Sequence, residues 1–118
     1  MKKLLFLFIF AFSLQGVMAQ QTAYYQYSEK LFNQGKEMFL GGNYVGAQDI
    51  LSKFIAETTD DRLREEANYM IAVSSFRRGA ENSGDVLKEF LDAHPETIHR
   101  HHLNFLIASF HFDRKEWK

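Results

Sequence analysis

Five histidines lie in the last quarter of this 118-residue chain: His94, His99, His101, His102 and His111. Imidazole groups bind zinc and exchange protons near neutral pH, so such a cluster raises a metal or catalytic hypothesis. On a helix, His99 and His102 would share a face, whereas His101 would point elsewhere. Zinc needs three or four converging ligands, and no carboxylate stands at a matching spacing before Asp113. We therefore predict solvated or ring-packed histidines, with a small metal-binding protein or histidine-dependent enzyme as the alternative.

The rest of the sequence holds no catalytic pattern. There is no cysteine nucleophile, no serine in a nucleophile-elbow setting and no glycine-rich segment with phosphate-loop spacing. The stretch TTDDRLREE, residues 58–66, alternates acidic and basic residues. This alternation predicts a solvated helix start with Asp60 or Asp61 as its N-cap. We expect a protein that is not an enzyme and that needs no cofactor.

One spacing recurs along the chain: an aromatic residue, a small residue three positions later, and a second aromatic four positions after that. Positions i, i+3 and i+7 share one face of a helix, whereas a strand would alternate with a period of two. The spacing therefore predicts three helices, 37 and then 36 residues apart. The three copies are Phe32, Gly35 and Phe39; Tyr69, Ala72 and Phe76; Phe105, Ala108 and Phe112.

A second helix is expected after each copy, because a small residue between two aromatics allows a partner helix to approach closely. Gly41, Gly42 and Asn43 break the first helix, and an apolar stripe then restarts at Ala47. A shift of 37 residues reproduces this stripe, with Ser83 and Asp85 as the N-terminal signal and Pro95 as the stop. Two helical hairpins are predicted.

The third hairpin is expected to be incomplete. Trp117 lies 73 residues, or two periods, after Tyr44, the aromatic residue that follows the first turn. It would therefore begin a sixth helix that the sequence does not contain. Phe105, Ile107 and Trp117 would then face an absent helix or water, so we expect marginal stability or self-association.

The N-terminus has the features of a secretory signal peptide. Lys2 and Lys3 precede a nine-residue apolar core, residues 4–12, and the small residues Val17 and Ala19 fit the positions before a cleavage site. The core is shorter than the ~20 residues that cross a bilayer, which disfavours a membrane anchor. We predict cleavage between Ala19 and Gln20 and a periplasmic or secreted product.

Composition excludes some partners. Without residues 1–19 the chain has 12 basic and 15 acidic residues and a formal charge of −3, which gives no footprint for nucleic acid. The absence of cysteine excludes disulfides and the lipid-modified cysteine of bacterial lipoproteins. Packing alone must hold the fold, and no lipid anchor is expected.

The stretch GKEMFLGGNYVGA resembles the tetratricopeptide repeat at its small, turn and alanine positions, which are Gly35, Gly42, Tyr44 and Ala47. The 36 to 37 residue spacing and EANYMIAVSSFRRG are similar to repeats of periplasmic Tol-Pal coordinator proteins and of the Bam assembly lipoprotein. The second turn departs from the pattern, with Gly84 at the alanine position. The resemblance covers Tyr24 to Lys118, and the Bam role would also need the anchoring cysteine.

The resemblance implies an all-α, right-handed α-solenoid of antiparallel hairpins with about two and a half repeats. Residues 1–19 are the signal peptide, and the repeats span about 24–60, 61–97 and 98–118. The implied function is a protein-interaction scaffold of the bacterial envelope, the N-terminal part of a longer array. The alternative is an assembly or cell-division coordinator with one protein client, associated with outer-membrane proteins.

First helices line the concave surface of such arrays, so the aromatic rows have two interpretations. They are either packing between neighbouring helices, which we favour, or a groove for a partner's peptide. Three further residues, Tyr24, Tyr25 and Tyr27, could extend the groove at its N-terminal end or cap the exposed first hairpin. The candidate groove residues are Tyr24, Tyr27, Phe32, Phe39, Tyr69, Phe76, Phe105 and Phe112.

Overall fold

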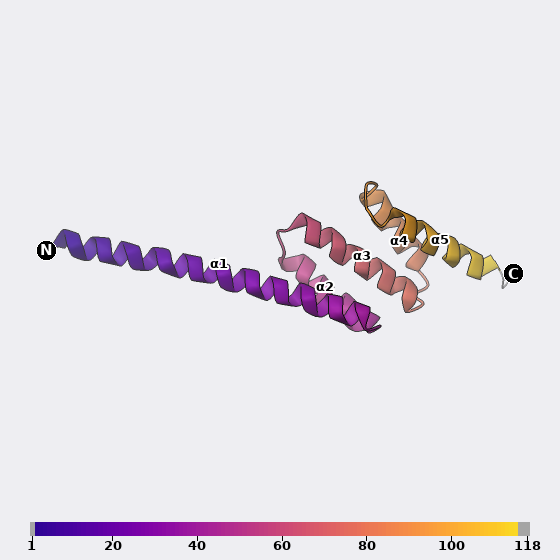
Figure 1. Cartoon of the computed structure of the whole chain (residues 1–118), viewed down its shortest axis with the longest axis horizontal. Helices are drawn as coiled ribbons and strands as arrows, with labels where there is room; N and C mark the ends of the chain where they lie inside the picture. Colours follow the sequence, from indigo (N-terminus) through magenta and orange to yellow (C-terminus); the bar gives the residue numbers. More distant parts are fainter. Residues whose placement is uncertain (1, 116–118) are drawn as a thin grey trace. The chain divides into compact units, whose positions relative to one another are not determined.

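The computed structural model is all-helical over the part of the chain that it describes (Figure 1). It describes the backbone of residues 2–115 and the side chains of residues 20–114. No strand occurs within that backbone, as the helical spacing predicts. The helices are α1 (Lys2–Leu40), α2 (Tyr44–Glu57), α3 (Asp61–Arg77), α4 (Ser83–Ala93) and α5 (Arg100–Lys115).

The chain divides into two units, one up to Lys30 and one from Leu31, and the division falls within α1. In the first unit, Tyr24, Tyr25 and Tyr27 are exposed, and the rings of the first two meet edge to face with centroids 6.3 Å apart. The predicted cleavage position after Ala19 lies within α1, and its cleavage stays a prediction. Among the described residues, no helix is both long enough and apolar enough to span a membrane.

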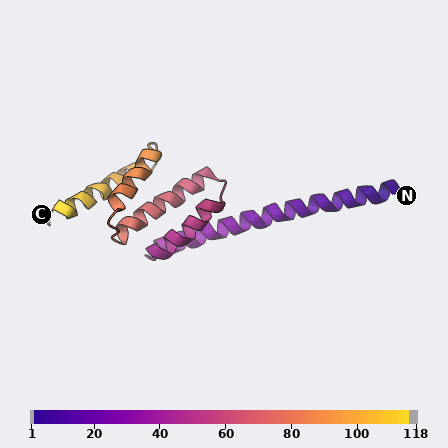
Figure 2. The same cartoon turned by 180° about the vertical axis from the view of Figure 1, so that it is seen from behind.

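In the second unit, each helix packs against the next one along the chain. The end of α1 contacts α2 through the rings of Phe32 and Phe54, and α2 packs on α3, α3 on α4 and α4 on α5. Figures 1 and 2 show from opposite sides that the chain reverses direction at each connection from α2 to α5. Apolar side chains from all of these helices form one buried core around Leu51, Phe54, Val73, Leu87 and Leu103.

The turns after α1 and α3 have the same backbone structure. Gly42 and Gly79 have φ of 83° and 78°, a left-handed conformation that glycine adopts without a steric penalty. The next amide, of Asn43 or Ala80, donates to a carbonyl five residues back, at 2.9 and 3.0 Å. This is the hydrogen bond of a Schellman motif. The second turn, which lacks an aromatic residue at its exit, thus closes as the first one does.

The loops before α3 and α5 also match in part. The buried Thr58 and Thr97 each accept, through Oγ1, a bond from the amide two residues later, at 3.1 and 3.2 Å. Asp60 then caps α3, because its Oδ1 accepts from the amides of Arg62 and Leu63. Of Asp60 and Asp61, the two N-cap candidates from the sequence, Asp60 is therefore the N-cap. His99 precedes α5 at the corresponding place, but its ring turns toward α3.

Helix ends agree with the sequence signals. α1 stops at Leu40, before the Gly41-Gly42-Asn43 break, and α4 stops at Ala93, two residues before Pro95. Asn82, rather than Ser83, occupies the N-cap of α4 and makes no side-chain cap bond. Trp117 lies outside the described residues.

Candidate functional site

An open cleft of about 460 Å³ lies in the second unit, between the end of α1, the first turns of α3 and the loop before α5. Cavities of this size hold small molecules or a few side chains of a peptide. Each of these three segments contributes both apolar and polar side chains to the lining. The lining residues are Phe32, Lys36, Arg62, Leu63, Glu65, Glu66, Glu96, Thr97, Ile98 and His99.

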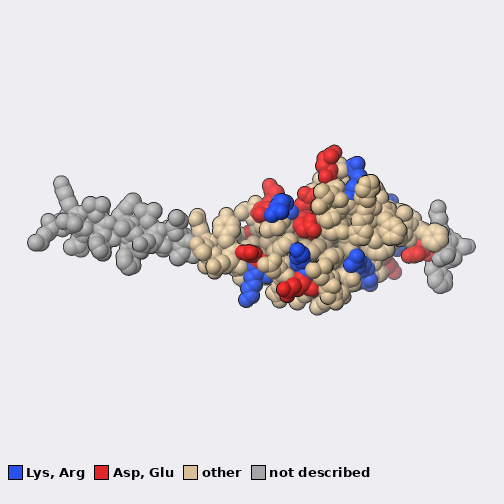
Figure 3. All heavy atoms as spheres, viewed as in Figure 1, with Lys and Arg blue, Asp and Glu red and all other residues tan. Residues whose placement is uncertain are grey.

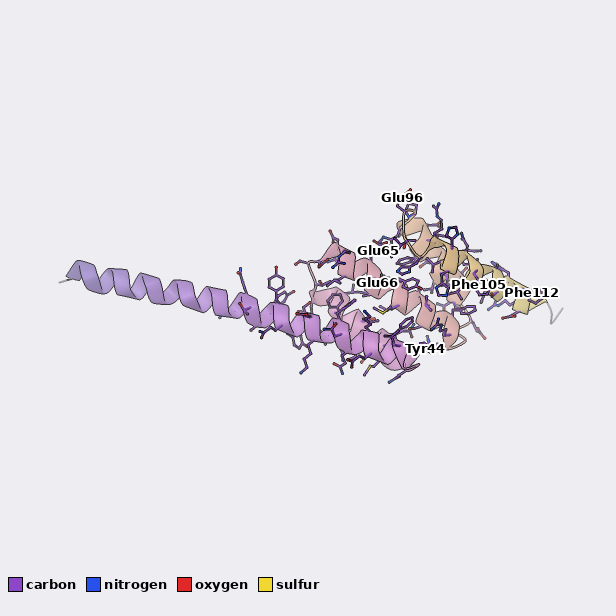
Figure 4. The ribbon with its side chains drawn as sticks, in the orientation of Figure 1. Tyr44, Glu65, Glu66, Glu96, Phe105 and Phe112 are labelled. Atoms are coloured by element: carbon purple, nitrogen blue, oxygen red, sulfur yellow. The ribbon has the colours of Figure 1, made fainter. Side chains whose placement is uncertain are left out.

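The cleft carries charge of both signs. Lys36 and Arg62 are basic, and the cleft also holds three glutamates, which Figure 4 labels: Glu65 and Glu66 on α3 and Glu96 on the loop. Within the described residues, Lys36, Arg62 and Glu96 make no ion pair. Blue and red residues also alternate over the face seen in Figure 3, without a field of one sign. Three cleft charges are thus available to a ligand.

His99 closes one side of the cleft through two contacts with α3. Its ring is stacked on that of Tyr69, with centroids 3.5 Å apart and planes 6° from parallel. Its Nε2 lies 2.8 Å from Oε2 of Glu66. A weaker contact nearby joins Nδ1 of His94 to Oε1 of Glu65 at 3.9 Å. These contacts hold the loop before α5 against α3, which fixes the shape of the cleft.

Tyr69 is the centre of this cluster. Its hydroxyl lies 2.6 Å from Nδ1 of His102, and its ring meets that of Phe90 at 6.1 Å. Burial raises the pKa of the Tyr69 hydroxyl, Glu66 raises it further, and Arg77 opposes both. Burial also lowers the pKa of His102, as do the nearby Arg77 and His99. Both shifts favour neutral side chains in this pair.

Two histidines contact different parts of the Tyr69 side chain. His99 and His102 were predicted to share a helix face, but only His102 lies on α5, which begins at Arg100. One stacks on the ring and the other meets the hydroxyl. In the described part of the chain, no group of three or more histidines, cysteines, aspartates or glutamates is placed to hold a metal ion. The ring of His99 packs on Tyr69, which is one of the two states predicted for the histidines.

The aromatic residues predicted for a groove do not form one exposed row. Phe32 and Tyr69 are buried at 8% exposure, Phe39 and Phe76 are half-buried, and Phe105 and Phe112 are exposed. Phe32 packs on Phe54 and also borders the cleft. Tyr24 and Tyr27 are exposed and belong to the first unit. Packing between helices thus describes Phe32 and Tyr69 better than a groove does.

The charged lining of the cleft was not predicted from the sequence. Lys36, Arg62 and Glu96 come from three segments, and no motif links them. The contact between Glu66 and His99 joins residues that are 33 positions apart, a separation that recurs in other contacts of the chain. Tyr69 with His102, Tyr44 with Arg77 and Glu81 with Arg114 have the same separation.

Comparisons of the chain with protein-family models, with curated proteins and with solved structures gave no match. The residues and their geometry therefore carry the functional argument.

Proposed function

We propose that this chain is an exported protein-interaction scaffold, built as a right-handed α-solenoid of tetratricopeptide-like hairpins, which binds a partner's peptide segment in the cleft. The product is released to the periplasm or secreted after cleavage between Ala19 and Gln20. Its partners are proteins or peptides of the envelope, and it carries no lipid anchor. The open, mixed-charge cleft is the observation that carries the proposed function.

Repeated contacts support the solenoid. Nη1 of Arg77 lies 3.4 Å from the Tyr44 hydroxyl, and Nη2 of Arg114 donates to the Glu81 carbonyl at 2.6 Å. Arg77 thus reaches from the end of α3 to the start of α2, and Arg114 reaches from the end of α5 to the turn before α4. Both members of the pair shift by 37 residues. The matching glycine turns repeat with the same offset. Local repetition of this kind is the basis of stacked-repeat folds.

The cleft lining indicates the ligand's chemistry. Ile98 is 90% exposed and stands with Leu63 beside the buried Phe32, so an apolar side chain could be covered there. Basic groups on α1 and α3, and glutamates on α3 and the loop, suit a segment with both charges. A short peptide with one apolar anchor between an acidic and a basic residue meets these conditions.

A peptide-display selection against the full chain tests this function. We expect enriched sequences to share an apolar anchor flanked by charged residues. Binding of a selected peptide should weaken at least about tenfold in Ile98→Glu, which places a charge at the apolar contact. The matched control is Leu40→Glu, since Leu40 is 72% exposed and does not line the cleft. Equal loss in both variants, or no enrichment, would count against the proposal.

Export has a separate test. Expression of the full chain in a bacterium should yield a periplasmic or secreted product whose N-terminal residue, read by mass spectrometry, is Gln20. The control is Ala19→Arg, which removes a small residue that the cleavage site requires and should leave the precursor uncut. An intact N-terminus on the wild-type product would contradict export by this route.

A further inference from the structure

One face of α5 is apolar and has no neighbour among the described residues. Phe105 is 67% exposed, Phe112 is 64% exposed, and Ala108 between them is also exposed. Figure 4 shows both phenylalanines on α5, one near its middle and one near its end. The opposite face of α5, through Leu103 and Leu106, is buried in the core. The Phe105 to Phe112 stripe is thus a second face, separate from the packed one.

The equivalent stripe of α1 is covered by a helix. Phe32 packs on Phe54 of α2 with ring centroids 5.1 Å apart, and Phe39 meets Tyr44 at 6.1 Å. Between them, a Cβ built on Gly35 would lie only 2.5 Å from Cδ2 of Leu51. The covering helix therefore presents a leucine to the small residue and an aromatic ring, three residues later, to the first aromatic residue.

The stripe of α3 is covered in the same way. Tyr69 meets Phe90 of α4 at 6.1 Å, and Ala72 and Leu87 are both buried. Leu87 and Phe90 follow Leu51 and Phe54 by 36 residues, so the covering helix again has the pattern Leu-x-x-Phe. Phe105, Ala108 and Phe112 follow the α3 stripe by the same 36 residues. The face on α5 thus has the same residue pattern as the faces of α1 and α3 that α2 and α4 cover.

We propose that the Phe105, Ala108 and Phe112 face of α5 docks an amphipathic helix of a partner protein, antiparallel to α5, that presents leucine and, three residues later, phenylalanine. The leucine packs on Ala108 and the phenylalanine on Phe105, as in the two internal interfaces. This extends the proposed interaction role to a second surface, and it stands or fails independently of the cleft.

The small residue sets which covering helix fits best. Gly35 leaves no room for a Cβ beside Leu51, whereas Ala72 carries one beside α4. Ala108 matches Ala72 rather than Gly35, so the face on α5 has the form that accepts α4. The α4 sequence SGDVLKEFLDA is therefore the best available probe. The α2 sequence YVGAQDILSKFIAE should fit less well.

The probe is a synthetic peptide of residues 83–93 with a side-chain lactam between Lys88 and Asp92, which are exposed and one helical turn apart. The lactam is needed because so short a helix is marginal in water. We expect saturable binding to the full chain, measured by fluorescence anisotropy. Binding should weaken at least about tenfold for Phe105→Glu, since a charge replaces the apolar contact. The Phe105→Glu variant should fold, because this side chain is exposed.

Three controls separate this proposal from its competitors. A lactam peptide with Leu87→Asp and Phe90→Asp should not bind, and the Tyr44–Glu57 peptide should bind more weakly than the α4 peptide. The cleft variant Ile98→Glu should bind the α4 peptide normally, which separates failure here from failure of the proposed function. The proposal is overturned by absent saturable binding, by unchanged binding to Phe105→Glu, or by equal binding of the α2 and α4 peptides. A dimer of the free chain that Phe105→Glu dissociates would overturn it in favour of a second copy.

Discussion

The ring of His99 lies flat on the ring of Tyr69, 3.5 Å away between centroids, although the two residues are 30 positions apart in the chain. This contact joins the loop before α5 to the middle of α3. Because the same imidazole lies 2.8 Å from Glu66, one residue sets the distance between two walls of the cleft. The packing of Tyr69 and the shape of the proposed binding site are therefore linked.

Tyr69→Phe should lower the free energy of unfolding by about 0.5–1.5 kcal/mol, because it removes the hydroxyl from His102 and keeps the ring on His99. Tyr69→Ala also removes the packed ring and should cost about 3 kcal/mol or more. Urea unfolding followed by circular dichroism measures both. Tyr44→Phe is the matched control, since its hydroxyl makes only a 3.4 Å exposed contact with Arg77. Equal effects of the two Tyr→Phe changes would contradict this role.

Acid should weaken the fold through His102. Its pKa in the folded chain is lowered from the ordinary value of 6.5, so the unfolded chain binds a proton more readily. The stability that neutral His102 contributes is complete above about pH 6.5 and is lost as the pH falls through the lowered pKa. Thermal unfolding between pH 7.5 and 4.5 measures this loss.

The variant His102→Gln should lose less stability over that range than the wild type, because it cannot take up the proton. His101→Gln is the control, since His101 is exposed on the same turn of α5. If the wild type and His102→Gln lose stability in parallel, His102 is not the group responsible.

Gly35→Ala should destabilise the second unit by about 1–3 kcal/mol, although alanine favours helix more than glycine does. The added Cβ would lie 2.5 Å from Cδ2 and 2.6 Å from Cγ of Leu51, a fully buried side chain that would have to shift. The midpoint of urea unfolding measures the change. Gln34→Ala, at the exposed neighbouring position, should change stability by less than about 0.5 kcal/mol. A stabilised Gly35→Ala variant would mean that the helices are not this close.

Gly79→Ala and Gly42→Ala should each cost about 1 kcal/mol, because both glycines have positive φ and no atoms crowd them. The cost is conformational, so Gly79→Asn should recover part of the loss. Parallel thermal unfolding of the three variants checks this. An effect at only one of the two turns would argue against equivalent hairpins.

Local signals in the sequence predicted much of the helical unit. The aromatic and small-residue spacing predicted α3, and the glycines of Gly41-Gly42-Asn43 and Pro95 predicted helix ends, because these effects act within one or two turns of chain. The turn at Gly79 was harder to predict, since it lacks the aromatic residue of the first turn. Its structure depends on a positive φ, which glycine permits whatever follows it.

The cleft could not be predicted in the same way. Lys36, Arg62 and Glu96 become neighbours only when three segments pack together, and their spacing follows no local period. The aromatic rows had also suggested a groove, but Phe32 and Tyr69 are covered by their partner helices. Their spacing was informative about packing. The location of exposed polar groups depended on how the helices pack together.

Mapping a display-selected peptide onto the full chain by NMR tests the central claim most directly. Titration into the isotope-labelled protein should shift the amide signals of Leu63, Glu66, Ile98 and His99, which border the cleft. The signal of Val45, an exposed residue of α2 that does not line the cleft, should stay unchanged. Saturable shifts confined to the cleft are the result we predict. Shifts elsewhere with the cleft signals unmoved would contradict a peptide-binding role for this site.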